Sequence, residues 1–351
     1  MSYIAKPKVH HPALAKNAIG LIRRDYEGAI TTLCAGCGHD SITAAIIQAF
    51  WELDIEPYRV AKLSGIGCSS KTPAYFLREA HGFNSVHGRM PSVATGANAA
   101  NRELIYIGVS GDGDSLSIGL GQLCHAIRRN LNLTYILENN GVYGLTKGQF
   151  SASADPGSKS KRGEPNTMAA IDGVLMALTL GATFVARSFS GDKEQLVPIL
   201  QAALRHRGFA FIDVISPCVT FNDHEGSTKS YAYTREHQVE VVEADFILPR
   251  KEITAEIAPG RGRRIQMHDG SWVTFHKVAE DYDATDRDRA YAYIRECQGR
   301  NEVATGLLYI DPDSRDMHDQ LGTVAPSLTT LPYEDLCPGS AELAKLQERF
   351  R

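Results

Sequence analysis

One stretch, residues 102–149, restricts the possible folds more than any other part of the chain. An apolar run ends at the sequence Gly-Asp-Gly-Asp-Ser (111–115), an amphipathic segment follows, and a second apolar run ends at Glu-Asn-Asn (138–140). The pattern changes from extended to helical and back, which is typical of a β-α-β unit with parallel strands. A right-handed connection places both strand ends, and therefore Asp112 and Asn140, at one edge of the sheet.

This arrangement suits a diphosphate and its metal ion. Glycines 111 and 113 allow a tight turn close to a ligand, and the helix that opens near Ser115 presents N–H groups to phosphate oxygens. Asp112 offers a carboxylate, Asn140 offers an amide oxygen, and a carbonyl just past Asn140 can complete the protein ligands of Mg²⁺. Each half alone is an ordinary turn or loop, but both halves around one β-α-β unit favour a ligand site.

Strand and helix patterns alternate over most of the chain, which predicts an α/β fold with a doubly wound, mostly parallel sheet. We expect an N-terminal arm (1–30), an α/β domain (31–225), and an irregular C-terminal extension (226–351) that packs on the core or on a neighbouring subunit. The expected helices include 42–53, capped by Asp40 or Ser41, and 168–180.

Charge and composition exclude several classes of protein. The 351 residues carry 37 Lys and Arg against 41 Asp and Glu, a net charge of −4, so no general basic field for nucleic acid exists. No segment approaches the length of a membrane span, and the first residues lack the apolar core of a signal peptide. We therefore expect a cytoplasmic protein without nucleic-acid or membrane partners, whose seven cysteines are thiols or metal ligands.

Four of these cysteines are expected at the same edge as Asp112. Cys34 and Cys37 precede a helix whose dipole should lower their thiol pKa values, and alone they fit a redox dithiol, a zinc half-site or an iron–sulfur half-site equally. Cys68 and Cys218 each follow an apolar strand in a Gly- or Pro-containing loop. Both could simply be small buried apolar side chains, but the shared edge favours metal ligation. Four thiolates alone accept either zinc or an iron–sulfur cluster.

The amino-acid sequence of these segments resembles that of a known protein family. Gly111-Asp112-Gly113, twenty-five residues and Asn139-Asn140 is similar to the diphosphate-binding signature of thiamine diphosphate enzymes. In that family the Asp, the second Asn and the carbonyl two residues later, here Val142, hold Mg²⁺. Two longer segments resemble the β subunit of 2-oxoacid:ferredoxin oxidoreductases: GDGDSLSIGLGQLCHAIRRN and NNGVYGLTKGQ. The resemblance extends over residues 30–225.

The resemblance implies three cofactors: thiamine diphosphate, Mg²⁺ and one [4Fe-4S] cluster. The cluster ligands would be Cys34, Cys37, Cys68 and Cys218. The implied thiamine diphosphate contacts are Ile66, Gly67, Cys68, Ser69, His87, Gly88, Arg89, Gly111, Gly113, Asp114, Ser115, Gly144, Leu145 and Thr146. Lys71, a candidate cation for the substrate carboxylate, and His87 are the candidate catalytic residues.

The implied activity is the oxidative decarboxylation of a 2-oxoacid with coenzyme A, with electrons leaving through the cluster to ferredoxin. The resemblance favours 2-oxoglutarate, while pyruvate and branched-chain 2-oxoacids stay open. An α subunit would supply the activating Glu and the coenzyme A site, in an (αβ)₂ heterotetramer. Two rivals remain: a non-redox thiamine diphosphate decarboxylase or carboligase with structural zinc, and a non-catalytic assembly subunit. Asp112 and Asn140 argue against the second, because an inactive relic has no physical reason to keep them.

Overall fold

The fold is organised around one nine-stranded sheet with the order β2-β1-β3-β4-β8-β7-β11-β10-β9. This computed structural model describes residues 11, 13–143, 149–157, 165–218, 252–268, 270–337 and 339–350. Six neighbouring strands are parallel: β2 (His81–Asn84), β1 (Val60–Ser64), β3 (Ile105–Gly111), β4 (Leu133–Asn139), β8 (Phe209–Ile215) and β7 (Phe184–Phe189). The doubly wound, mostly parallel sheet expected from the sequence is confirmed.

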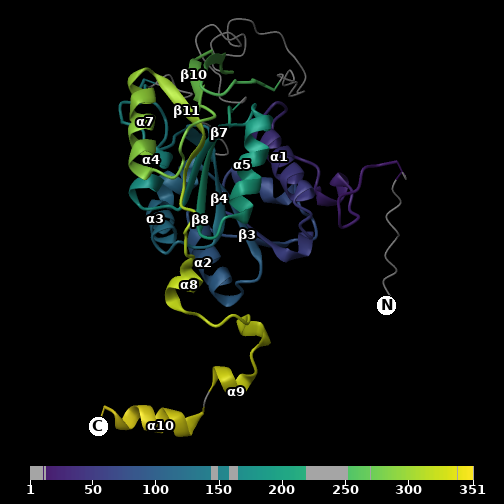
Figure 1. The fold of residues 1–351 in the computed structure, drawn as a ribbon, viewed down its shortest axis with the longest axis vertical. Helices are drawn as coiled ribbons and strands as arrows, with labels where there is room; N and C mark the ends of the chain where they lie inside the picture. Colours follow the sequence, from purple (N-terminus) through teal and green to yellow (C-terminus); the bar gives the residue numbers. More distant parts are fainter. Residues whose placement is uncertain are drawn as a thin grey trace, which may run out of the picture.

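Helices cover both faces of the sheet (Figure 1). One face packs against α1 (Gly38–Glu52) and α5 (Lys193–Arg205), and the other against α2 (Met90–Ala100), α3 (Leu120–Arg128), α4 (Gly173–Thr179) and α7 (Arg287–Gly299). Because the central strands are buried on both faces, they read as continuous apolar runs rather than as alternating ones. Within the described ranges, each helix is too short or too polar to cross a membrane.

The expected β-α-β unit is present, with β3 and β4 paired in parallel and Gly111 in register with Glu138. Its helix is divided, because a π-helical turn, Gly113–Ile118, precedes α3. Turns of this type interrupt helices at functional sites. The carboxyl ends of β3 and β4 therefore lie side by side.

Several expected boundaries were wrong. Helix α1 begins at Gly38, four residues earlier than expected, and its N-cap is Cys37 rather than Asp40 or Ser41; the extended backbone of Cys37 makes no side-chain capping bond. Helix α4 begins five residues later than expected, where the side chain of Asp172 accepts hydrogen bonds from two backbone N–H groups. A strong cap decides a helix start that the apolar pattern leaves open.

The C-terminal region adds strands to the same sheet. Strand β11 (Glu302–Ile310) pairs antiparallel with β7, and β10 (Trp272–Lys277) and β9 (Gly262–Gln266) follow at the edge. Beyond them, α8 (Met317–Leu321) lies against the body, and α9 (Tyr333–Leu336) and α10 (Ser340–Glu348) lead away from it (Figure 1). The remaining short elements are η1 (Arg23–Tyr26), η2 (Pro57–Arg59), η3 (Ser69–Ala74), η5 (Leu328–Thr330), β5 (Val142–Tyr143) and β6 (Gln149–Phe150).

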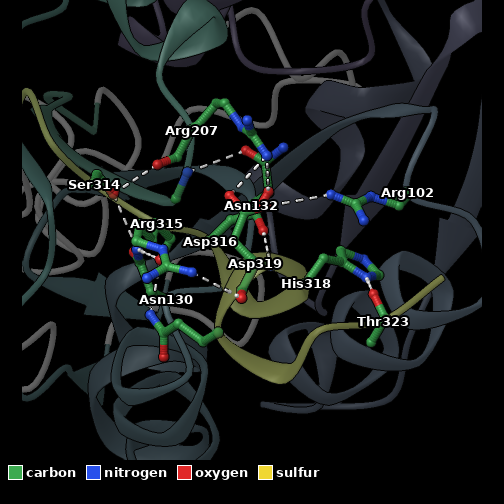
Figure 2. A network of polar contacts seen from close by, with 12 residues as sticks. Arg102, Asn130, Asn132, Arg207, Ser314, Arg315, Asp316, His318, Asp319 and Thr323 are labelled. Carbon is green, nitrogen blue, oxygen red and sulfur yellow. Dashed lines mark hydrogen bonds and ion pairs between the residues drawn. The ribbon is translucent and has the colours of Figure 1, made fainter. Parts of the chain in front are cut away.

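Helix α8 is tied to the amino edge of the sheet by an ion-pair network (Figure 2). Asp319 lies 2.8 Å from Arg207 and 3.4 Å from Arg102, and Asp316 lies 3.4 Å from Arg207. These arginines precede β8 and β3, so the network anchors the C-terminal region at the end of the sheet opposite Asp112.

Candidate functional site

Asp112 and Asn140 follow β3 and β4 directly, at the carboxyl edge where ligands bind in open α/β sheets. Asp112 is only 1% exposed, and its Oδ2 accepts hydrogen bonds from Gly141 N at 3.0 Å, from Ser153 Oγ at 2.5 Å and from Ser151 Oγ. Burial raises the pKa of Asp112, and the serine hydroxyls oppose that rise.

The two serines were missed by the sequence analysis. They lie in the polar segment 147–166, which has no periodicity that could place it, and the structure folds its first described part back over Asp112. Ser153 Oγ also donates to Asn139 Oδ1 at 2.9 Å, and Ser151 N donates to Gly141 O at 3.0 Å. The Asp112 carboxylate is therefore held both by the loop that follows β4 and by the segment that carries Ser151 and Ser153.

A cavity of about 60 Å³ opens beside Asp112. Its lining consists of Ile66, Gly67, Cys68, Ser69, His87, Gly111, Asp112, Gly113, Asp114, Asn140, Val142 and Tyr143. The loops after β1, β3 and β4 and the segment before α2 thus meet around one space. Tyr143 is the lining residue that sequence reasoning did not single out; its hydroxyl donates to Gly113 O at 3.1 Å. A Cβ on Gly113 would lie 2.5 Å from the Tyr143 ring, so only glycine fits there.

Asp114 joins two of these loops. Its Oδ1 accepts a hydrogen bond from Gly88 N at 2.7 Å and its Oδ2 accepts one from Ser110 Oγ at 2.8 Å. A Cβ added to Gly65 would lie 1.8 Å from Oδ2. Both carboxylate oxygens therefore bind protein donors, and in the structure Asp114 shapes the cavity wall.

The remaining predicted residues lie at varying distances from the cavity. The buried Ser115 hydroxyl forms a hydrogen bond of 2.6 Å with Tyr135 Oη, and Ser115 is not part of the cavity lining. Arg89 is exposed at the start of α2 and is not part of the cavity lining. Lys71 is half-buried, and its backbone N donates to Cys68 O at 3.1 Å. Gly144, Leu145 and Thr146 lie outside the described residues.

The four predicted cluster cysteines come to this same edge. Cys37 interacts electrostatically with Cys218, and Cys68 with Cys34. Backbone bonds from Cys37 N to Cys34 O (3.0 Å) and from Gly38 N to Pro217 O (3.4 Å) link the segments. Among the described residues, no three His, Cys, Asp or Glu side chains are grouped to hold a metal ion. Four thiols from three neighbouring segments fit the chemistry of a [4Fe-4S] cluster.

The expected lowering of the thiol pKa is wrong for Cys37. Burial raises the pKa of Cys37, and burial also raises the pKa of Cys68, although the positive charge of Lys71 opposes it. Loss of hydration outweighs the helix dipole in so buried a position.

A buried polar group beneath the cysteines was also missed. Glu138 and His39 are almost fully buried, with Oε2 and Nδ1 3.3 Å apart. Burial raises the pKa of Glu138 well above its usual value and lowers the pKa of His39 to about 4. Burial thus disfavours the charged form of both groups, and the imidazole is neutral at pH 7. Two polar residues inside apolar patterns give no sequence signal of their contact.

A larger cavity, about 340 Å³, lies at the opposite, amino edge of the sheet. Arg102, Arg207 and Asp316 line it, and the ion pairs of Figure 2 balance the charges of both arginines. Volume alone does not identify the site, because the residues suited to bind a metal and a diphosphate all lie at the carboxyl edge.

Comparisons with known proteins agree with this geometry. Residues 65–214 match the family of thiamine pyrophosphate enzymes, C-terminal TPP binding domain. A 2-oxoacid:ferredoxin oxidoreductase β subunit from Aeropyrum pernix is 34% identical over 328 residues, covering 90% of this chain and 92% of the relative. One from Saccharolobus solfataricus is 43% identical over 208 residues, covering 59% of this chain and 68% of the relative. The structure of 2-oxoglutarate:ferredoxin oxidoreductase from Magnetococcus marinus, with 2-oxoglutarate, coenzyme A and succinyl-CoA bound, aligns with a TM-score of 0.69 and 29% identity, covering 89% of this chain and 91% of that one.

Proposed function

This chain belongs to the family of 2-oxoacid:ferredoxin oxidoreductase β subunits, and from that premise we propose that its enzyme oxidatively decarboxylates 2-oxoglutarate. The products would be an acyl-CoA and CO₂, with electrons passed to ferredoxin. The observation that carries this proposal is the position of Cys68, which lies in the wall of the cavity beside Asp112 and also interacts with a second predicted cluster ligand, Cys34.

Asp112, Asn140 and the carbonyl of Val142 would hold Mg²⁺, because they offer hard oxygen ligands within one cavity. Gly113 and the following helix start would bind the diphosphate through backbone N–H groups. The Tyr143 ring lies against Gly113 and narrows the cavity at that point. When bound, thiamine diphosphate supplies the nucleophilic carbon that takes up the 2-oxoacid and allows CO₂ to leave.

Cys34, Cys37, Cys68 and Cys218 would bind one [4Fe-4S] cluster. The turn that carries Cys68 also lines the cavity, so a cluster held by these thiols would lie beside the bound substrate and could accept its electrons one at a time. Cys37 is buried, so this ligand of the cluster would be shielded from water.

The substrate proposal rests on the relative whose structure holds 2-oxoglutarate. Lys71 would attract a substrate carboxylate, since it is half-buried near Cys68. His87 lines the cavity and is exposed, so it could contact a ligand from the solvent side. An α subunit would supply the activating Glu and the coenzyme A site in an (αβ)₂ assembly, with ferredoxin as the acceptor.

The test is dye reduction by the complex of this chain with its α subunit, purified without oxygen. We expect thiamine diphosphate and 2-oxoglutarate to support viologen reduction and acyl-CoA formation more strongly than pyruvate or branched-chain 2-oxoacids do. Asp112→Ala should abolish the reaction while leaving the iron content unchanged. A colourless, zinc-loaded complex that decarboxylates without reducing the dye would instead indicate a non-redox enzyme, and a complex inactive with every 2-oxoacid would contradict the proposal.

A further inference from the structure

We propose that Glu138 is a positioning residue for the [4Fe-4S] cluster of the proposed function, on which this role depends. Its carboxyl joins the three segments that carry Cys37, Cys68 and Cys218. Glu138 is 0% exposed near the end of β4, the central strand between β3 and β8. It thus lies at the carboxyl edge to which those three segments converge.

The contact to the Cys68 segment runs through Thr72. Its Oγ1 lies 3.1 Å from both Oε1 and Oε2 of Glu138, and Thr72 is itself 0% exposed. Thr72 belongs to η3, which begins at Ser69 directly after Cys68. The Ser69 side chain also lowers the pKa of the Glu138 carboxyl, against the larger effect of burial. Contacts of this short turn with Glu138 therefore fix the direction in which Cys68 enters the turn.

The contact to the other two cysteine segments runs through His39. Its Nδ1 lies 3.3 Å from Glu138 Oε2 and 2.6 Å from Ser216 Oγ. His39 follows Cys37 by two residues in the first turn of α1, and Ser216 precedes Cys218 by two residues. One imidazole nitrogen is thereby shared between the carboxyl of β4 and the loop after β8.

A carboxyl is expensive to bury unless its oxygens are hydrogen-bonded. Across the described residues, no Lys or Arg forms an ion pair with Glu138, so hydroxyl groups and one imidazole are the partners that compensate its burial. An apolar side chain would fill the same space but would leave the buried Thr72 hydroxyl without its acceptor. Residues that orient metal ligands through hydrogen bonds, without binding the metal themselves, contribute in this way to metal retention.

The test compares variants of the αβ complex purified without oxygen. The measurements are iron and acid-labile sulfide per chain, the rate of iron loss to a chelator, and the EPR spectrum of the reduced protein. Glu138→Ala should lose iron about 10-fold faster than the unmodified chain and should show shifted g values. Glu138→Gln keeps the length and one acceptor oxygen for Thr72, and should retain iron almost as well as Glu138.

Ile136→Ala is the matched control. Ile136 is fully buried on the same face of β4, and its replacement removes volume without removing a polar contact. It should leave iron retention and the EPR spectrum unchanged. If Glu138→Ala does not fold, Thr72→Val removes one hydroxyl at constant shape and should still speed iron loss several-fold.

Unchanged iron loss and EPR spectra in Glu138→Ala or Thr72→Val would overturn this role, as would an equal effect of Ile136→Ala. An unmodified complex that contains no iron and sulfide would instead overturn the proposed function itself, so the two failures are distinguishable.

Discussion

Replacing Gly65 with alanine tests whether the loops around the cavity are held by Asp114. The added Cβ would lie 1.8 Å from Asp114 Oδ2 and 3.2 Å from Ser110 Oγ. Asp114 cannot give way cheaply, because Gly88 N holds its Oδ1 at 2.7 Å and Ser110 Oγ holds its Oδ2 at 2.8 Å. The substitution therefore forces the carboxylate to rotate and weakens both hydrogen bonds.

The expected magnitude follows from these contacts. Forcing extra volume into a packed site costs about 1–3 kcal/mol, and weakening hydrogen bonds to a charged group costs about 1.5–3 kcal/mol. We expect Gly65→Ala to lower the free energy of unfolding by about 3 kcal/mol, which shifts the urea midpoint by about 1 M for an m value near 3 kcal/mol/M. Binding of Mg²⁺ with thiamine diphosphate should weaken as well, because Gly88 moves with Asp114.

Urea unfolding followed by circular dichroism measures the first effect, and titration calorimetry the second. Gly121→Ala in α3 is the control, since nothing lies within 4 Å of its added Cβ. A helical alanine there should be neutral or stabilising by up to about 1 kcal/mol. If Gly65→Ala unfolds at the same urea concentration as the unmodified chain and binds the cofactors equally, the account of the Asp114 contacts is incorrect.

Three further outcomes are expected. Replacing Ser151 and Ser153 with alanine removes two donors to the carboxylate predicted to bind Mg²⁺, so calorimetry should show about 10-fold weaker Mg²⁺ binding; unchanged affinity would count against their role. Arg187→Met leaves the buried Asp213 carboxylate, 2.8 Å away, without its cation, and urea unfolding should show a loss of about 3–5 kcal/mol; a loss below about 1 kcal/mol would contradict this. Burial lowers the pKa of His206 to about 4, so the unfolded chain binds a proton that the folded chain excludes, and stability falls as the pH drops from about 6.5 towards 4. His206→Asn should reduce that pH slope by up to about 1.4 kcal/mol per pH unit, and an unaltered slope would refute the assignment.

Local patterns were enough to predict the centre of the fold. The apolar runs that became β3 and β4 and the glycines at 111 and 113 depend on neighbours within a few residues, and parallel pairing then forces Asp112 and Asn140 to one edge. The same topology brought Cys68 and Cys218 there. Helix starts were less predictable: α4 begins where Asp172 caps it, whereas α1 begins after Cys37, which makes no side-chain capping bond.

Contacts between distant segments were decided only by the tertiary structure. The imidazole of His39 contacts the hydroxyl of Ser216, which lies 177 residues later in the chain. Strands from the C-terminal region add to the sheet beside β7. Ser151 and Ser153 reach Asp112 from a segment without apolar periodicity. Hydrophobic period and turn chemistry act over short stretches of chain, so they determined the elements and their carboxyl edge. Which polar side chains meet beneath that edge depends on how whole layers pack, and no local pattern records it.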